Sequence, residues 1–108
     1  MTARIQPNST HLAPPQYSTN FGEFIGIGPN GNLWVEDCDV KDLADKFGTP
    51  LFLVSESQFR HTYRKFRDAF CEHYPGEVAI LFANKSNNGL AYRHIMNQEG
   101  AGGDCFGV

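Results

Sequence analysis

Lys85 is the residue of this sequence whose type and position best suit chemistry. It follows the apolar run Val78–Ala83 and precedes a polar stretch. In α/β proteins, functional side chains gather in the loops at the carboxyl ends of strands. An amine that is partly removed from water at such a place has a lowered pKa, so it can be neutral and nucleophilic toward an aldehyde. The pattern therefore predicts a lysine that forms a Schiff base.

Three other interpretations of this region compete with a Schiff-base lysine. Lys85-Ser86 matches the end of a phosphate-binding loop, but strand-forming residues stand where its glycines belong. Gly100–Gly103 does not suit a dinucleotide loop, because it follows a predicted helix and precedes a predicted strand. An ordinary surface lysine with its stem on apolar neighbours stays open. Schiff-base chemistry, which pyridoxal phosphate enzymes use, is favoured.

The second half of the chain alternates between helices and strands. Ser55 and Gln58 form a capping-box signature for a helix with one apolar stripe and a basic face that we expect to be solvated. The run Val78–Ala83 is apolar on both faces, which is typical of a strand covered on both sides. The apolar stripe consists of Phe59, Tyr63, Phe66 and Phe70, and the basic face includes Arg60, Arg64, Lys65 and Arg67.

A second helix is predicted from Asn88-Gly89 through Gln98, and a strand from Asp104 to Val108. The inward face of this helix is predicted to carry Leu90, Ala91, His94 and Ile95. His94 is therefore interpreted as a core histidine and not a catalytic one. Helix, strand, helix, strand is the alternation of an α/β protein with a parallel sheet. Two such strands cannot cover themselves, which predicts a fragment of a longer protein.

The first half divides into a leader and a β segment. Residues 1–20 are rich in Pro, Ser, Thr, Asn and Gln and are predicted to be disordered. Residues 21–54 are predicted to form an N-terminal β segment with a short helix that Asp39 caps and Gly48 ends. The strands expected here are Phe24–Ile27 and Asn32–Glu36, joined as a hairpin, and Leu51–Val54.

Composition limits the partners. The 108 residues carry a net charge of −3, which gives no basis for binding nucleic acid or an anionic membrane. No apolar run reaches the roughly 20 residues of a membrane-spanning helix, and no signal peptide is apparent, so a cytoplasmic protein is predicted. Three widely spaced cysteines, Cys38, Cys71 and Cys105, are expected to be reduced, packed thiols and not a metal site.

Several motifs resemble a known family. Phe82–Asn87 resembles the Y-A-x-K-[AC]-N signature of the fold-type III pyridoxal-phosphate decarboxylases that act on ornithine, arginine or meso-diaminopimelate. Leu43–Phe52 is similar to the family's L-A-x-x-[FY]-G-T-P-L-[FY] segment, Tyr63–Phe70 to its Y-R-x-F-R-x-A-F helix, and Glu99–Asp104 to its E-G-x-G-x-D segment. The matches keep the family's order, and diaminopimelate decarboxylase is the member they resemble most.

The resemblance implies a fold and a site. Residues 55–108 would be the truncated start of a pyridoxal-phosphate-binding (β/α)8 barrel like that of alanine racemase, beside a β domain to which the early strands belong. Lys85 would be the catalytic residue and would carry pyridoxal 5'-phosphate as a Schiff base on the first barrel strand. Ala83 and Asp104 would be the other cofactor-binding residues, and no metal is implied.

The activity implied is decarboxylation of a basic or diamino acid, with meso-diaminopimelate converted to lysine as the first choice. The full-length parent would act as a homodimer on a small amino-acid substrate, and the isolated fragment would be inactive. Phe82, Asn84 and Ser86 depart from the signature, which leaves the substrate open. The alternatives are a non-catalytic homologue or truncated product that binds a protein partner, and a racemase-like barrel.

Overall fold

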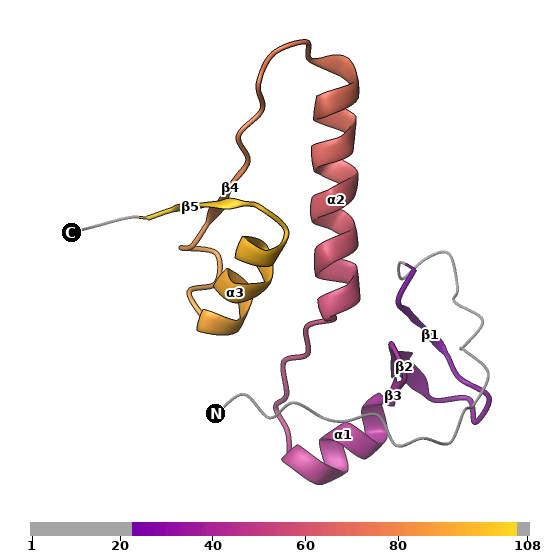
Figure 1. The fold of residues 1–108 in the computed structure, drawn as a ribbon. Helices are drawn as coiled ribbons and strands as arrows, with labels where there is room; N and C mark the ends of the chain where they lie inside the picture. Colours follow the sequence, from indigo (N-terminus) through magenta and orange to yellow (C-terminus); the bar gives the residue numbers. More distant parts are fainter. Residues whose placement is uncertain (1–22, 106–108) are drawn as a thin grey trace. The chain divides into compact units, whose positions relative to one another are not determined.

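The structure is a computed structural model that describes residues 23–105. The predicted leader and the end of the strand predicted to reach Val108 lie outside this range. Within it the chain has a mixed α/β fold with three helices and two small sheets, shown in Figure 1. The chain divides into two compact units, residues 1–58 and 59–108, and each is described by itself.

The first unit contains a small antiparallel sheet in the order β1-β2-β3, formed by Ile25–Ile27, Leu33–Val35 and Cys38–Asp39. The predicted hairpin is confirmed: Ile25 pairs with Val35, and the Gly31 N–H donates to the Gly28 carbonyl at 3.0 Å. A Cβ built on Gly28 would lie 2.2 Å from Trp34 Nε1. The turn therefore needs glycine for the indole to pack against it. The third strand was not predicted.

Helix α1 spans Val40–Phe47 and has the predicted ends. Asp39 caps it, because its Oδ1 accepts a hydrogen bond from the Lys41 N–H at 2.8 Å. Gly48 adopts φ 82° and donates its N–H to the Ala44 carbonyl at 2.8 Å, which ends the helix. Leu43 is buried and, with Trp34, forms the apolar core of this unit among the described residues.

The strand predicted at Leu51–Val54 is wrong. These residues have no regular secondary structure, and Phe52 is 96% exposed. Apolar residues form a strand only when another strand pairs with their backbone. No pairing partner for them lies among residues 23–105.

Helix α2 spans Glu56–His73 and begins where the capping signature predicts, since Ser55 Oγ accepts from the Gln58 N–H at 2.9 Å. Glu36 supports the same helix end: its Oε1 accepts from the Ser57 N–H at 2.9 Å and from the Ser55 hydroxyl. The side chain that makes these contacts comes from a residue with φ 52°. The carboxylate also suits the positive end of the helix dipole.

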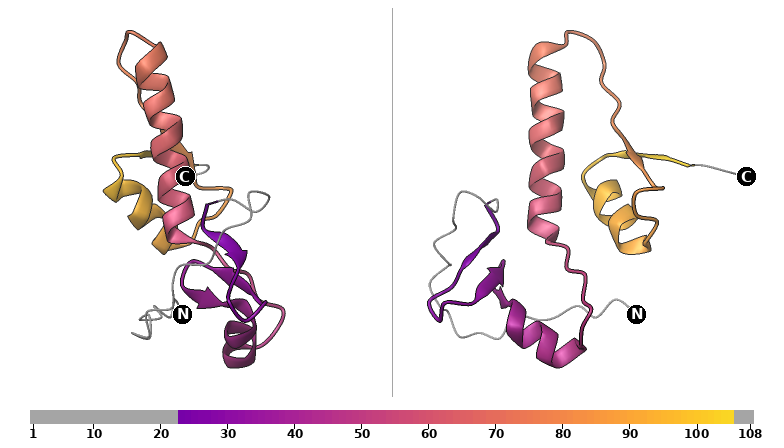
Figure 2. Two further views of the ribbon diagram at one scale, coloured as in Figure 1. Left: turned by 90° about the vertical axis from the view of Figure 1, so that its right-hand side faces the viewer. Right: turned by 180° about the vertical axis from the view of Figure 1, so that it is seen from behind.

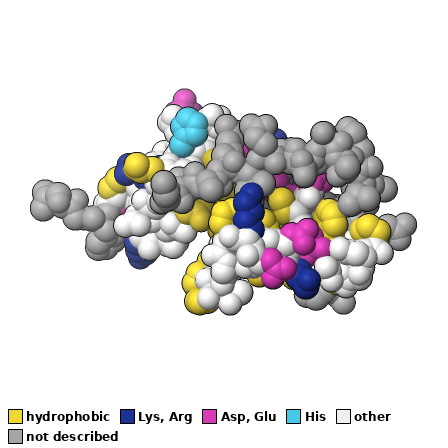
Figure 3. Space-filling view, turned by 90° about the horizontal axis from the view of Figure 1, so that it is seen from below, with side chains coloured by type: hydrophobic (Ala, Val, Ile, Leu, Met, Phe, Trp, Pro, Cys, Tyr) yellow, Lys and Arg dark blue, Asp and Glu magenta, His cyan; other side chains and the backbone are white. Residues whose placement is uncertain are grey.

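The apolar stripe of α2 is only partly covered in the second unit. The Phe59 ring makes edge contacts with Phe82 at 5.5 Å and with Tyr92 at 5.8 Å between centroids. Phe66 and Phe70 contact each other but are 53% and 48% exposed. The predicted helix is thus confirmed, whereas burial of its stripe is not. Hydrophobic side chains, drawn in yellow, reach the surface in Figure 3.

The second unit contains a two-stranded parallel sheet, as the alternation predicted. Strand β4 (Leu81–Ala83) pairs with β5 (Gly102–Asp104), and helix α3 (Leu90–Gln98) connects them, as Figure 2 shows from two sides. The strand predicted over Val78–Ala83 is therefore shorter than expected, and β5 begins two residues early. The prediction that β4 is covered on both sides is wrong for the described residues, since Leu81 is 60% exposed. Among these residues β4 has one neighbouring strand, β5.

The predicted inward face of helix α3 is confirmed only in part. Ala91 and Ile95 are half-buried, but Leu90 is 81% exposed, and the most buried residue, Met96 at 4% exposure, was not predicted. His94 is also exposed and lies 3.0 Å from Gln98 by its Nε2 atom, so its interpretation as a core histidine is wrong. The predicted stop at Gly100 is confirmed by its φ of 84° and by the Ala101 N–H, which donates to the Met96 carbonyl at 2.9 Å. Among residues 23–105 no helix has the length and apolar character needed to cross a membrane.

Candidate functional site

Lys85 lies in a tight turn directly after β4. The Ser86 N–H donates to the Ala83 carbonyl at 3.0 Å, and the Ser86 hydroxyl donates to the same oxygen at 2.7 Å. Lys85 is thus the third residue of a four-residue turn that two hydrogen bonds hold closed. The turn places the lysine backbone at the carboxyl end of β4, which is where the sequence predicted it.

Asp104 and Ala83 are partners in the register of the parallel sheet. The Asn84 N–H donates to the Asp104 carbonyl at 3.1 Å, so the pairing continues to the residue before Lys85. The sheet therefore brings together the ends of the two strands that carry the predicted site residues. Asp104 lies at this edge of the sheet although it is nineteen residues after Lys85 in the sequence.

The two faces of the sheet differ. Phe82 and Asn84 line a cavity of about 360 Å³ together with residues of α3, including Arg93 and Met96. Because side chains alternate along a strand, Ala83 belongs to the opposite face, and so does its register partner Asp104. Lys85, Ala83 and Asp104 do not line this cavity. We therefore separate the cavity under α3 from the candidate site.

Lys85 and Asp104 are both exposed. The partial burial expected for the Lys85 amine is thus not present in the described residues. Burial at a strand end requires neighbouring strands and loops, and β4 has one such neighbour here. Lys85 follows the carboxyl end of β4, as predicted, whereas Asp104, which was predicted to begin a strand, is the last residue of β5. The expected roles of both residues stay predictions.

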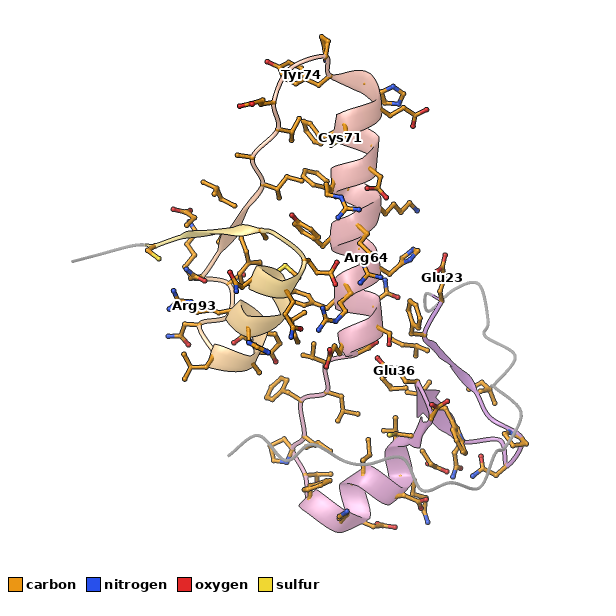
Figure 4. All side chains as sticks on the ribbon, in the orientation of Figure 1. Glu23, Glu36, Arg64, Cys71, Tyr74 and Arg93 are labelled. Atoms are coloured by element: carbon orange, nitrogen blue, oxygen red, sulfur yellow. The ribbon has the colours of Figure 1, made fainter. Side chains whose placement is uncertain are left out.

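A charged cluster joins α2 to the end of α3. The Glu99 carboxylate accepts hydrogen bonds from Arg60 Nη1 at 2.7 Å and from Arg64 Nε and Nη2 at 2.6 Å each. The Glu99 side chain is only 6% exposed. Figure 4 labels Arg64 on α2. Hydrogen bonds from Arg64 and then Arg60 lower the pKa of Glu99 to about 2, and those to Glu99 raise the pKa of Arg64.

This cluster was not predicted from the sequence. Arg60 and Arg64 were assigned to a solvated basic face: Arg64 is exposed, as predicted, whereas Arg60 is half-buried, and the pairing of both with Glu99 was not predicted. Their spacing of four residues, which places two guanidinium groups on one face of a helix, was an available signal. Nothing local identified Glu99 as their partner, because it lies 35 residues beyond Arg64.

The three cysteines are not part of a metal site in the described part of the chain. Cys38, Cys71 and Cys105 are free thiols, but only Cys38 is half-buried, so the expectation that all three are packed is wrong. Burial, followed by the charges of Asp37 and Glu36, raises the pKa of Cys38. In the described part of the chain, no three His, Cys, Asp or Glu residues are grouped so that they could hold a metal ion.

Comparison with known proteins shows what the chain is similar to. No protein-family model matches the chain, and no solved structure matches it. Curated relatives do match: one from Synechocystis sp. is 37% identical over 78 residues, which are 72% of this chain and 17% of the relative. Relatives from Methanothermobacter thermautotrophicus and Methanocaldococcus jannaschii are 35% and 33% identical over 75% and 69% of this chain and 19% and 18% of their own lengths.

These matches confirm the resemblance to the decarboxylase family that the motifs indicated. Within that family, each of the three relatives is named diaminopimelate decarboxylase, so the chain is related to a segment of those enzymes. The chain spans less than a fifth of the length of each of them.

Proposed function

We propose that the chain is part of a pyridoxal-phosphate-dependent decarboxylase that converts meso-diaminopimelate to lysine, with Lys85 as the catalytic lysine. The observation that carries the proposal is Lys85 in a closed turn after β4, within a segment related to diaminopimelate decarboxylases. Residues 55–108 would begin a (β/α)8 barrel, and residues 21–54 would belong to a β domain. A homodimer in the cytoplasm belongs to the same proposal.

The residues at this end of the sheet suit the aldehyde end of the cofactor. Lys85 supplies a primary amine on an exposed turn, and Asp104 supplies a carboxylate from the neighbouring strand. Gly102 and Gly103 present no side chain next to them. A carboxylate near an ammonium group favours its charged form, so Asp104 is suited to orienting the amine. Ala83 adds a small side chain on the same face as Asp104.

Each residue would have a separate task. Lys85 would hold the cofactor until substrate arrives and would afterwards release the product by taking the cofactor back. Asp104 would orient the Lys85 amine. Bound pyridoxal phosphate would supply the electron sink that loss of carbon dioxide from an amino acid requires.

The test is reductive trapping at a defined lysine. The protein, expressed as its gene encodes it, is incubated with pyridoxal 5'-phosphate and sodium borohydride, and the labelled peptides are mapped by mass spectrometry. Lys85 should carry most of the label at low cofactor concentration. Lys41, Lys46 and Lys65, the other lysines of the sequence, are internal controls for non-specific reaction.

Activity is measured with the same samples as carbon dioxide release from meso-diaminopimelate, with ornithine and arginine as competing substrates. Lys85→Ala should lower the rate by about 100-fold or more, the scale on which loss of a positioned catalytic group acts. Lys65→Ala, the matched control on α2, should leave it unchanged. Equal labelling of all four lysines together with no decarboxylation would instead favour the non-catalytic, partner-binding homologue.

A further inference from the structure

The segment Gly100–Gly103, which leads from the end of α3 into β5, has few side chains that could hold it in place. Three of its four residues, Gly100–Gly103, are glycine, and Gly102, Gly103 and Asp104 are all exposed. Glycine loses more backbone freedom on folding than any other residue. Without side-chain packing, the path of this segment therefore depends on how its two ends are attached.

At the far end, the attachment is the sheet itself. The Gly102 N–H donates to the Ile80 carbonyl at 2.9 Å, and the Asn84 N–H donates to the Asp104 carbonyl at 3.1 Å. These hydrogen bonds fix the register that places Asp104 opposite Ala83. A sheet of two three-residue strands is weak by itself, since isolated pairs of strands are marginally stable at best.

At the near end, the attachment is the Glu99 carboxylate. It immediately precedes Gly100, is 6% exposed, and accepts three hydrogen bonds from two guanidinium groups of α2 at 2.6–2.7 Å. Charge-assisted hydrogen bonds of this kind are about twice as strong as neutral ones. The Phe59 ring, next to Arg60, packs edge-on against Phe82 of β4, so α2 contacts β4 as well as the residue that precedes Gly100.

We propose that Glu99 is a positioning residue: by accepting hydrogen bonds from Arg60 and Arg64, it fixes the start of Gly100–Gly103 and thereby the register of Asp104 beside the Lys85 turn. This inference rests on the proposed function for its consequence at Lys85. Its structural part, the link between Glu99 and the β4–β5 register, stands independently and is tested independently.

The first experiment measures amide hydrogen exchange by NMR in the protein and in its Glu99→Gln variant. Glutamine keeps the size of the side chain but removes its negative charge and replaces one accepting oxygen with an NH2 group, which cannot accept a hydrogen bond from an arginine. The Asn84 and Gly102 amides, which carry the register, should exchange about fivefold faster in the variant. The Glu36 amide, which donates to the Phe24 carbonyl in the other unit, should exchange at the original rate.

The matched control is Asp68→Asn. Asp68 also pairs with an arginine of α2, at 2.7 Å from Arg67 Nη2, but that pair joins adjacent residues on the helix surface. The substitution removes the same charge and should change neither register amide. Arg64→Gln is the second test variant, in case Glu99→Gln fails to fold, and it should accelerate the same two amides.

The second experiment repeats borohydride trapping with pyridoxal phosphate on the same variants. The share of label at Lys85, relative to Lys65, should fall in Glu99→Gln and stay constant in Asp68→Asn. Unchanged Asn84 and Gly102 amides would overturn the inference, and so would uniform acceleration that includes Glu36. If the wild-type protein shows no preference for Lys85, the proposed function fails. If it shows the preference and Glu99→Gln retains it, only the positioning role fails.

Discussion

Asp39→Ala tests a buried polar side chain that makes several hydrogen bonds in the first unit. Asp39 is 6% exposed, and its carboxylate accepts hydrogen bonds from Asn30 Nδ2 at 2.6 Å, Asn32 Nδ2 at 2.8 Å and the Lys41 N–H at 2.8 Å. Asn30 Oδ1 in turn accepts from Trp34 Nε1 at 3.0 Å. The carboxylate therefore joins the hairpin turn, the third strand and the start of α1.

The loss of stability expected for Asp39→Ala follows from these contacts. Loss of a helix cap removes about 1 kcal/mol. The two amide contacts are hydrogen bonds to a charged group, worth about 1.5–3 kcal/mol each where both partners stay dry. Asn30 is exposed, so water replaces much of its contact, and Asn32 is half-buried. We expect Asp39→Ala to lower the free energy of unfolding by about 2–3 kcal/mol, and Asp39→Asn, which keeps a capping oxygen, by about 1 kcal/mol.

The stability that the Asp39 carboxylate contributes should depend on pH in a definite direction. Burial alone would raise the pKa of Asp39, but hydrogen bonds from Asn32, Asn30, Lys41 and Asp42 outweigh it and hold the pKa below the ordinary 3.8. A lowered pKa contributes stability that is fully present above 3.8 and is lost as the pH falls through the folded-state value. The difference between wild type and Asp39→Asn should therefore shrink as the pH falls below about 3.8.

The assay is equilibrium unfolding in urea, followed by the fluorescence of Trp34. It is the one tryptophan of the sequence and is 8% exposed, so its emission reports on this network. Asp45→Ala is the control: Asp45 is 71% exposed in its pair with Lys41, and its loss should change stability by less than about 0.5 kcal/mol. A midpoint for Asp39→Ala equal to that of the control would refute the reasoning.

Three further outcomes are expected. Gly28→Ala should destabilise the first unit by about 1–3 kcal/mol, because its Cβ would lie 2.2 Å from Trp34 Nε1; an unchanged urea midpoint would contradict this. Gly100→Ala should lower the free energy of unfolding, followed by far-UV circular dichroism, by about 1 kcal/mol. The loss comes from its φ of 84° alone, since open space surrounds the position, and a stabilised variant would show that this backbone relaxes. The stabilising effect of the Glu99 charge should be complete above pH 4.5 and should vanish as the pH falls toward about 2, so the difference in stability between wild type and Glu99→Gln must narrow over that range.

The local features of the fold were predictable from short stretches of sequence. The Asp39 cap, the Gly48 and Gly100 stops and the Ser55 cap are all interactions within a few residues. Such signals depend on φ preferences and on the donors left unpaired at helix ends, which do not change with tertiary context. The position of Lys85 after an apolar strand was visible for the same reason.

Strand lengths and exposure were less predictable. Leu51–Val54 and Val78–Ile80 are as apolar as residues that do form strands, yet they lie outside the sheets. A strand exists only where another backbone pairs with it, and apolar character alone does not supply that partner. His94 likewise occupies a position of suitable helical periodicity, but burial depends on what lies opposite it.

The sequence by itself determined the helix ends, the hairpin turn, the lysine motif and the relationship to diaminopimelate decarboxylases, because each is written in residues that are close together or in a fixed order. Only the tertiary structure revealed that Glu99 meets Arg60 and Arg64, and that Asp104 pairs opposite Ala83. These contacts join residues that lie 21 to 39 positions apart. Their partners are chosen by how the chain packs, which no local pattern specifies.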